Sequence, residues 1–262
     1  MTWIEALVLG IIQGLTEFLP VSSSGHLEIG SVLLGVESTE NLLFAIVVHL
    51  ATAIATLVVF WKDIQVIIGD LLKFRWNEST QFVCKLLLSM VPVFVVGIFF
   101  KDQIEQLFVG NLSLVGSMLL VTSALLFFAH YKKDGNKSIS NVAAIIIGVA
   151  QSLAILPGIS RSGATISTAL ILGVERSKAA RFSFLMVLLP IIGASILQIK
   201  TYVEEPSLHQ IGSLQLIIGF LAAFLSGFIA CKWMLRIVKK GKLTIFAGYC
   251  LLVGIIAVIS SL

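Results

Sequence analysis

Residues 10–37 read GIIQGLTEFLPVSSSGHLEIGSVLLGVE, and residues 148–175 repeat them without a gap as GVAQSLAILPGISRSGATISTALILGVE. Each copy is an apolar helix, a proline, a break rich in serine and glycine, and a short apolar helix. Paired interruptions in the apolar segments of two protein halves point to a binding site within a membrane. We therefore expect the chemistry of this protein at the two breaks. The identical pairs are Gly10/Gly148, Gln13/Gln151, Leu15/Leu153, Ser22/Ser160, Ser24/Ser162, Gly25/Gly163, Leu34/Leu172, Gly35/Gly173, Val36/Val174 and Glu37/Glu175.

The composition of the chain is that of a membrane protein. Apolar residues make up 58% and charged residues 12% of the sequence, whereas soluble domains carry about 25% charged residues. This composition excludes a soluble nucleic-acid-binding protein, despite the net charge of +4. Crossing ~30 Å of hydrocarbon takes about 20 apolar residues. The candidate spans are Leu42–Trp61, Phe82–Phe100, Leu112–His130, Phe182–Ile199, Ile211–Leu235 and Leu243–Leu262.

The order of these segments predicts an all-α integral membrane protein with an inverted-topology repeat. Three full spans separate the two copies, so the second copy starts on the opposite side of the membrane. Breaks rich in proline, serine and glycine expose backbone groups that lipid cannot satisfy. This favours two re-entrant helix-loop-helix hairpins beside six full transmembrane helices. Residues 1–262 then form a single membrane domain with internal repeats 1–131 and 139–262.

Lysine and arginine are distributed unequally between the two sides. Of the 18, thirteen fall on one side, two fall on the other, and Lys85, Arg161 and Lys232 lie within or beside spans. An excess of positive charge marks the cytoplasmic side. We therefore expect a multi-pass protein whose termini and site both face outward. The thirteen are Lys62, Lys73, Arg75, Lys132, Lys133, Lys137, Arg176, Lys178, Arg181, Arg236, Lys239, Lys240 and Lys242, and the two are Lys101 and Lys200.

The first copy places an acid, an alcohol and an imidazole near its break. Gln13 and Glu17 are four residues apart and share one helix face. Glu17 lies in an apolar run, where a carboxylate costs roughly 2.5–3.5 kcal/mol, so it is a functional candidate; a carboxylate bonded to helix ends for structure is the alternative. Ser23 and His26 follow the break. His49, in the middle of a span, is expected to bond to a neighbouring helix for structure.

The second copy places a cation at its break. Arg161 stands opposite Ser23, and Thr165 stands opposite Leu27. If the breaks meet near the membrane midplane, a carboxylate, a hydroxyl, an imidazole and a guanidinium converge with two helix N-termini. This set favours a multiply charged anion such as a phosphate. Serines present in both copies are expected mainly to cap helices. The residues expected around the anion are Ser22, Ser24, Gly25, Ser160, Ser162, Gly163 and Thr165.

A membrane-embedded enzyme is favoured over two other classes. Inverted repeats with broken helices are also typical of secondary transporters, and a lipid flippase could use the same architecture. A carrier needs a binding site, but it does not need a hydroxyl, an imidazole and a carboxylate beside an arginine. A purely structural membrane protein has no reason to bury Glu17 and Arg161.

At these residues the chain resembles the undecaprenyl-diphosphatase family, also called the bacitracin-resistance (BacA) proteins. The stretch GLTEFLPVSSSGH, residues 14–26, looks like the first signature of the family, and Gln13-x-x-x-Glu17 fits its (Glu/Gln)-x-x-x-Glu element. The stretch PGISRSGAT, residues 157–165, looks like its Pro-Gly-x-Ser-Arg-Ser-x-x-Thr signature. The chain length and the span pattern match throughout.

The resemblance implies a phosphatase of the bacterial cytoplasmic (inner) membrane. It would cleave the terminal phosphate from undecaprenyl diphosphate and regenerate the monophosphate carrier used in cell-wall synthesis. A homodimer and a divalent cation, Mg²⁺ or Ca²⁺, are also implied. Glu17 would bind the metal, with Gln13, or act as base, and Arg161 would clamp the phosphates. Ser23, His26 or an activated water could attack, and Ser23 with His26 as its acid/base partner is the favoured pair. Some members carry Glu where this chain has Gln13, which concentrates the role of the acid on Glu17.

Overall fold

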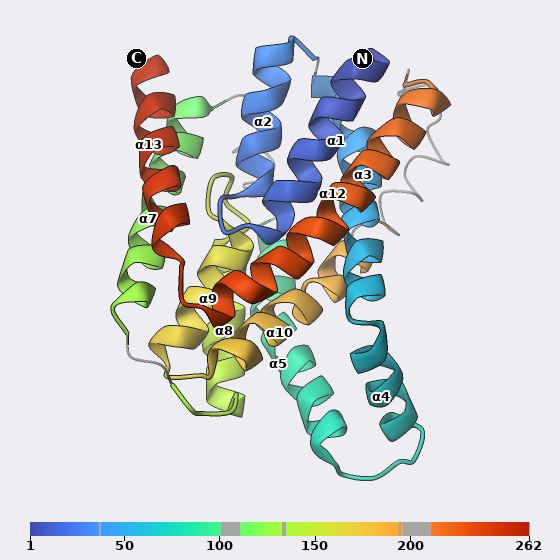
Figure 1. Ribbon diagram of the computed structural model, residues 1–262, viewed down its shortest axis with the longest axis vertical. Helices are drawn as coiled ribbons and strands as arrows, with labels where there is room; N and C mark the ends of the chain where they lie inside the picture. The colour runs from blue at the N-terminus through green and yellow to red at the C-terminus, as the bar shows by residue number, and fades with distance from the viewer. Residues whose placement is uncertain (37, 101–110, 133–134, 194, 196–210, 262) are drawn as a thin grey trace.

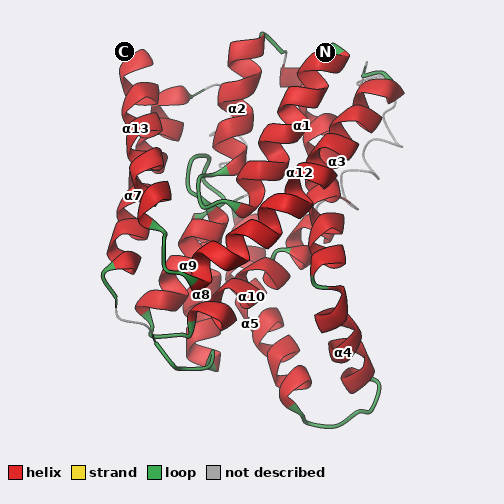
Figure 2. Cartoon of the chain, viewed as in Figure 1, coloured by secondary structure: helices red, strands yellow, loops and turns green. Residues whose placement is uncertain are grey.

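The computed structural model describes residues 1–36, 38–100, 111–132, 135–193, 195 and 211–261. In this part of the chain the regular structure is helical, with no named strand and one isolated bridge between Lys137 and Val174 (Figure 2). The first half contains α1 (Trp3–Phe18), α2 (Ser23–Leu34), α3 (Ser38–Val59), α4 (Trp61–Leu71), α5 (Glu78–Phe99) and α7 (Leu112–His130). The second half contains α8 (Asn141–Leu153), α9 (Arg161–Ile171), α10 (Arg176–Met186), α12 (Ser213–Lys239) and α13 (Thr244–Ser260).

The second helix of each repeat copy begins with the same N-cap. The Ser22 hydroxyl accepts a hydrogen bond from the backbone N–H of Gly25 at 3.3 Å, in front of α2. The Ser160 hydroxyl accepts one from the N–H of Gly163 at 3.0 Å, in front of α9. Serine is favoured here because its oxygen satisfies an N–H that has no partner inside the helix. The capping expected of the repeated serines is confirmed at these two positions.

The repeated Leu-Gly-Val run ends these two helices. Gly35 has a φ of +67° and Gly173 a φ of +82°, in the left-handed region that glycine enters without a Cβ penalty. The N–H of the following valine bonds in both cases to a carbonyl five residues earlier. The helices therefore stay short. At 1.5 Å per residue, the 12 residues of α2 span about 18 Å, less than the ~30 Å of a bilayer core.

Two repeated glycines let helices of the two halves cross closely. A methyl group added at Gly10 of α1 would lie 2.6 Å from the carbonyl oxygen of Gly219 on α12. A methyl group added at Gly148 of α8 would lie 2.3 Å from the carbonyl oxygen of Ser89 on α5. The first helix of each copy thus packs against a helix of the other half, and the halves share one bundle.

Most predicted spans correspond to helices. Among the described residues, α5, α7 and α12 are long and apolar enough to cross a membrane. Residues Leu43–Val59 and Trp61–Leu71 form a further candidate span that bends by 75° at its break. The predicted span Leu243–Leu262 corresponds to the shorter apolar helix α13.

The predicted span Phe182–Ile199 coincides with two helical segments, because a turn at Val187 separates α10 from helical residues 188–193. Helix α10 begins earlier, at Arg176, and ends at Met186, and a turn follows at Val187. Pro190 explains this end, because proline has no N–H to donate to the carbonyl four residues earlier and its ring clashes with that carbonyl. Residues 194 and 196–199 of the predicted span lie outside the described residues, as do Glu37, Lys101, Lys133 and Lys200.

The two hairpins approach the centre of the bundle from opposite ends (Figure 1). Both termini lie at one end, where α1 starts and to which α2 returns. The α8–α9 hairpin comes from the other end, where the α4–α5 and α7–α8 connections also lie. These connections carry Arg75, Lys132 and Lys137, which belong to the basic side of the sequence count.

Candidate active site

The two breaks meet at the centre of the bundle. The Ser162 hydroxyl of the second break donates a hydrogen bond to the Leu19 carbonyl of the first at 3.2 Å. A methyl group added at Gly25 would lie 3.3 Å from the Cα of Gly158. On α7, the Thr122 hydroxyl donates to the Gly158 carbonyl at 3.1 Å and so anchors the second break. Segments far apart in the sequence therefore form one site.

Glu17, near the C-terminal end of α1, connects the polar groups of this site. Its side chain is only 7% exposed. The Ser23 hydroxyl donates to Oε2 of Glu17 at 2.7 Å, and Nε2 of Gln13 donates to the same oxygen at 3.0 Å. Arg161 forms an ion pair with Oε1. A buried carboxylate needs such partners, because an unpaired buried charge is costly.

Arg161 is the first residue of α9 and brings a cation from the second copy to the acid of the first. Its second terminal nitrogen donates to the Ser183 carbonyl on α10 at 3.3 Å. One turn along α9, the Thr165 hydroxyl donates to the Arg161 carbonyl at 2.9 Å and lies 2.6 Å from the Ser183 hydroxyl. A guanidinium carries five N–H donors. The contacts with Glu17 and Ser183 therefore leave donors that an anion could use.

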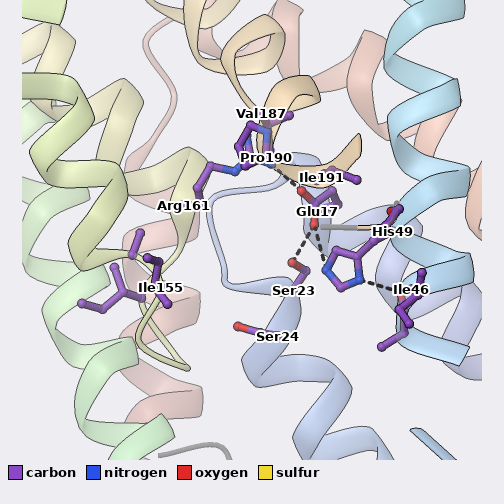
Figure 3. A pocket seen from close by; sticks show the side chains of 14 residues that line it. Glu17, Ser23, Ser24, Ile46, His49, Ile155, Arg161, Val187, Pro190 and Ile191 are labelled. Atoms are coloured by element: carbon purple, nitrogen blue, oxygen red, sulfur yellow. Dashed lines mark hydrogen bonds and ion pairs between the residues drawn. The ribbon is translucent and has the colours of Figure 1, made fainter. Parts of the chain in front are cut away.

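A cavity of about 380 Å³ opens beside this cluster. Figure 3 shows Arg161 and His49 reaching Glu17 from opposite sides, with Ser23 next to the same carboxylate. Apolar side chains from α3, from the C-terminal end of α8 and the second break and from residues 187–191, together with Ser195, complete the lining. Ligand sites commonly combine a mostly apolar wall with a few convergent polar groups. This cavity has that character.

Among the residues expected around an anion, Ser24 alone lines the cavity. The others maintain the fold of the breaks. Ser22, Gly25, Ser160 and Gly163 form the two caps, Ser162 links the breaks, and Thr165 supports Arg161.

His26 is not brought to the cluster around Glu17. Its Nε2 lies 2.8 Å from the hydroxyl of Tyr249 on α13, and its Nδ1 lies 2.8 Å from the Ser22 carbonyl oxygen. It is not among the residues that line the cavity. The convergence expected from the sequence therefore includes Glu17, Ser23 and Arg161 but leaves His26 outside.

His49 supplies the imidazole that faces the cavity. Its Nε2 lies 3.8 Å from Oε2 of Glu17, and its side chain is 30% exposed. Nδ1 lies 2.7 Å from the carbonyl of Ala45 on the same helix, and because a carbonyl only accepts, Nδ1 donates. The sequence interpretation of His49 as a structural residue missed this position. An ionisable residue in the middle of an apolar span was the signal that could have indicated it.

The oxygen atoms of Gln13 and Glu17 could bind a small divalent cation, but only if a phosphate supplied further ligands. Oε1 of Gln13 is buried and has no hydrogen-bond partner among the described residues. Mg²⁺ is commonly bound through one or two carboxylates plus substrate phosphates. No group of three or more His, Cys, Asp or Glu side chains gathers in the described part of the chain. Gln13 and Glu17 would thus supply two ligands, and phosphate oxygens and water the rest.

Comparison with known proteins identifies the family. The family model described as bacitracin resistance protein BacA matches residues 6–256. The chain belongs to this family. A relative in Parabacteroides distasonis, named undecaprenyl-diphosphatase, is 54% identical over 264 residues, covering 100% of this chain and 99% of its own. Relatives with the same name are 55% identical over 257 residues in Christiangramia forsetii (97% of each chain) and 42% identical over 258 residues in Halothermothrix orenii (97% and 96%). Membership confirms the resemblance seen in the two signature stretches.

Proposed function

We propose that this protein is an undecaprenyl-diphosphatase. It hydrolyses the terminal phosphate of undecaprenyl diphosphate to give undecaprenyl phosphate and inorganic phosphate, and so recycles the cell-wall lipid carrier. The observation that carries this conclusion is the cavity in which Arg161 of one break meets Glu17 and Ser23 of the other. Two full-length relatives with this name are 54% identical to the chain. Arginine suits a phosphate, and the acid and hydroxyl suit proton transfer and attack.

In the proposed reaction Ser23 attacks the terminal phosphorus. A bond forms between Oγ and phosphorus, the bond from phosphorus to the bridging oxygen breaks, and undecaprenyl phosphate leaves. Glu17 takes the proton, since its Oε2 already accepts the Ser23 hydroxyl at 2.7 Å. Arg161 stabilises the charge that develops on the phosphoryl oxygens. Water then attacks the phosphorus of the phosphoserine, the bond between Oγ and phosphorus breaks, Oγ takes back the proton from Glu17, and inorganic phosphate leaves.

Attack by a water that Glu17 activates is the alternative to a serine nucleophile. His26 is a weaker candidate for nucleophile or acid/base partner, because both of its ring nitrogens have partners in the fold. His49 lies 3.8 Å from Glu17 and is exposed to the cavity. It is therefore the better placed imidazole to pass the proton onward.

A divalent cation, Mg²⁺ or Ca²⁺, is part of the proposal. As the alternative to acting as base, Glu17 would hold it through the carboxylate, together with the unpartnered amide oxygen of Gln13. When bound, the cation would stabilise the negative charge on the diphosphate oxygens. The single carboxylate makes the ion dependent on the substrate for further ligands.

The proposed setting is the bacterial cytoplasmic (inner) membrane. We propose six full spans with α1–α2 and α8–α9 as re-entrant hairpins, arranged as inverted repeats 1–131 and 139–262. The short lengths of α2 and α9 support the hairpins. The basic residues of the sequence support outward-facing termini and an outward-facing site. The proposed homodimer is supported by the family resemblance.

Phosphate release from undecaprenyl diphosphate by the purified full-length protein tests the function. We expect turnover in the presence of Mg²⁺ or Ca²⁺, and loss of that turnover in Glu17→Gln, which keeps the shape of the side chain and removes its charge. A protein that moves the lipid between bilayer leaflets without releasing phosphate would instead be a secondary transporter or flippase.

A further inference from the structure

His26 is held between α2 and α13, away from the cavity. Its Nδ1 lies 2.8 Å from the Ser22 carbonyl oxygen and its Nε2 lies 2.8 Å from the Tyr249 hydroxyl. A carbonyl only accepts hydrogen bonds, so Nδ1 donates, and the other nitrogen of a neutral ring accepts from Tyr249. The rings of His26 and Tyr249 also stack, with centroids 5.5 Å apart. The His26 ring therefore bridges Tyr249 and Ser22, and both of its nitrogens are used in doing so.

Ser22 needs such support, because its backbone has a conformation that L side chains rarely adopt. Its φ is +71°, where a residue other than glycine is strained and persists only when its surroundings hold it. The Ser22 carbonyl accepts from the backbone N–H of His26 at 3.1 Å and from the His26 ring at 2.8 Å. This carbonyl belongs to the peptide unit that joins Ser22 to Ser23. The ring of His26 thus sets the orientation of that peptide.

Ser23 is the residue whose placement depends on this peptide. Its Oγ lies 2.7 Å from Oε2 of Glu17. Rotation of the Ser22–Ser23 peptide would move the hydroxyl away from Glu17 and from the phosphate site beside Arg161. A misplacement of about 1 Å at a reacting group can cost about a hundredfold in rate.

Helix α13 provides a fixed support for this chain of contacts. It crosses α7 so closely that a methyl group on Gly116 would lie 2.8 Å from the Gly254 carbonyl oxygen. The Ser123 hydroxyl of α7 also donates to the Ala247 carbonyl at 2.7 Å. Next to Tyr249, the Cys250 thiol lies 3.5 Å from the Pro20 carbonyl oxygen in the first break. Two successive residues of α13 therefore hold the first break.

We propose that Tyr249 is a positioning residue for the reaction. Acting through His26 and the Ser22 carbonyl, it holds the Ser23 hydroxyl within hydrogen-bonding distance of Glu17. This role rests on the proposed phosphatase function and assigns His26 to alignment. It affects kcat more than KM, because the substrate is bound by Arg161 and by cavity walls from other elements.

The first test is Tyr249→Phe, which removes the hydroxyl and keeps the ring. Phosphate release from undecaprenyl diphosphate is measured with the purified full-length protein, together with its unfolding temperature. We expect kcat to fall about tenfold or more, KM to stay within about twofold, and the unfolding temperature to fall by no more than about 2–4 °C, as for the loss of one hydrogen bond. Tyr131→Phe is the matched control, because Tyr131 is 70% exposed at the end of α7 and also contacts a histidine ring. It should keep the wild-type kcat.

Further variants separate the hydrogen bond from general packing. Tyr249→Gln keeps an N–H donor and should retain more kcat than Tyr249→Leu, which has none. The double variant of Tyr249→Phe and His26→Asn should be no slower than His26→Asn alone, because both changes break one chain of contacts. Wild-type kcat in Tyr249→Phe, or losses that multiply in the double variant, would overturn the proposal. An inactive wild-type protein would contradict the phosphatase function itself, and with it this role.

Discussion

Ser23 and Ser24 are adjacent serines that both line the cavity but differ in their partners. Ser23 donates to Glu17 at 2.7 Å, whereas Oγ of Ser24 lies 3.5 Å from the hydroxyl of Ser22. If Ser23 is the nucleophile, Ser23→Ala should lower kcat by about a thousandfold or more, and Ser24→Ala should change it by less than about threefold. Phosphate release by the two variants measures this difference. An active Ser23→Ala protein would assign the attack to water.

Arg161→Lys separates the charge of the arginine from its geometry. Lysine keeps a cation beside Glu17, so it avoids the cost of leaving that buried carboxylate unpaired. It loses the planar fork that matches phosphate oxygens. We expect kcat to fall by about 10²–10³-fold, which is the cost of removing a transition-state donor. Arg75→Lys, at an exposed position in the α4–α5 connection, is the control. A fully active Arg161→Lys protein would show that charge alone is sufficient.

The sequence predicted those site residues whose type is rare in an apolar segment. Glu17 and Arg161 are charges in apolar segments, and the repeat alignment places them at two breaks that meet. The position of His49 beside Glu17 was not predicted, because His26 lies in a signature and His49 does not. Their positions depend on how α2 and α3 are rotated, and this rotation follows from the packing of α2 against α1 and of α3 against α12 and α1.

The close helix crossings at the repeated glycines should not tolerate a larger side chain. Gly148→Ala should destabilise the protein by about 1–3 kcal/mol, since overpacking has this cost and the added methyl group would lie 2.3 Å from a carbonyl oxygen of α5. Gly97→Ala, also in a helix, has no atom within 4 Å of the added methyl group. It should be neutral or slightly stabilising, because alanine favours a helix. Thermal unfolding in detergent measures both, and equal unfolding temperatures would contradict the tight α5–α8 crossing.

The end of a helix could be predicted where the residue at that position itself stops the helix. Repeated serines and glycines determine the start and end of α2 and α9 through local hydrogen bonds. The end of α10 also has a local cause, Pro190, but the apolar run that continues through it hid this signal. The 75° bend after Val59 lies close to Trp61, where the predicted span Leu42–Trp61 ends. The charged residues Lys62 and Asp63 follow directly and are the local signal for this end.

At the scale of the whole molecule, an odd number of spans between two copies of a motif predicts that the copies face each other. The contact between the two breaks agrees with this argument. Symmetry also explains why the copies share their caps and differ in their chemistry. Two acids or two arginines at one centre would repel each other, whereas Glu17 and Arg161 attract.

The same arrangement predicts which ends of the bundle face the cytoplasm. Figure 1 shows the C-terminus and the α4–α5 connection at opposite ends. Basic residues gather in the connections of the second end, so that end should be cytoplasmic. Ser261→Cys should react with a membrane-impermeant maleimide in intact cells, and Arg75→Cys should react only after the membrane is opened. Replacing the exposed Cys84 with serine leaves the buried Cys231 and Cys250 in place and removes background labelling. Labelling of Arg75→Cys in intact cells would show the opposite orientation, in which the first break, with Glu17 and Ser23, faces the cytoplasm.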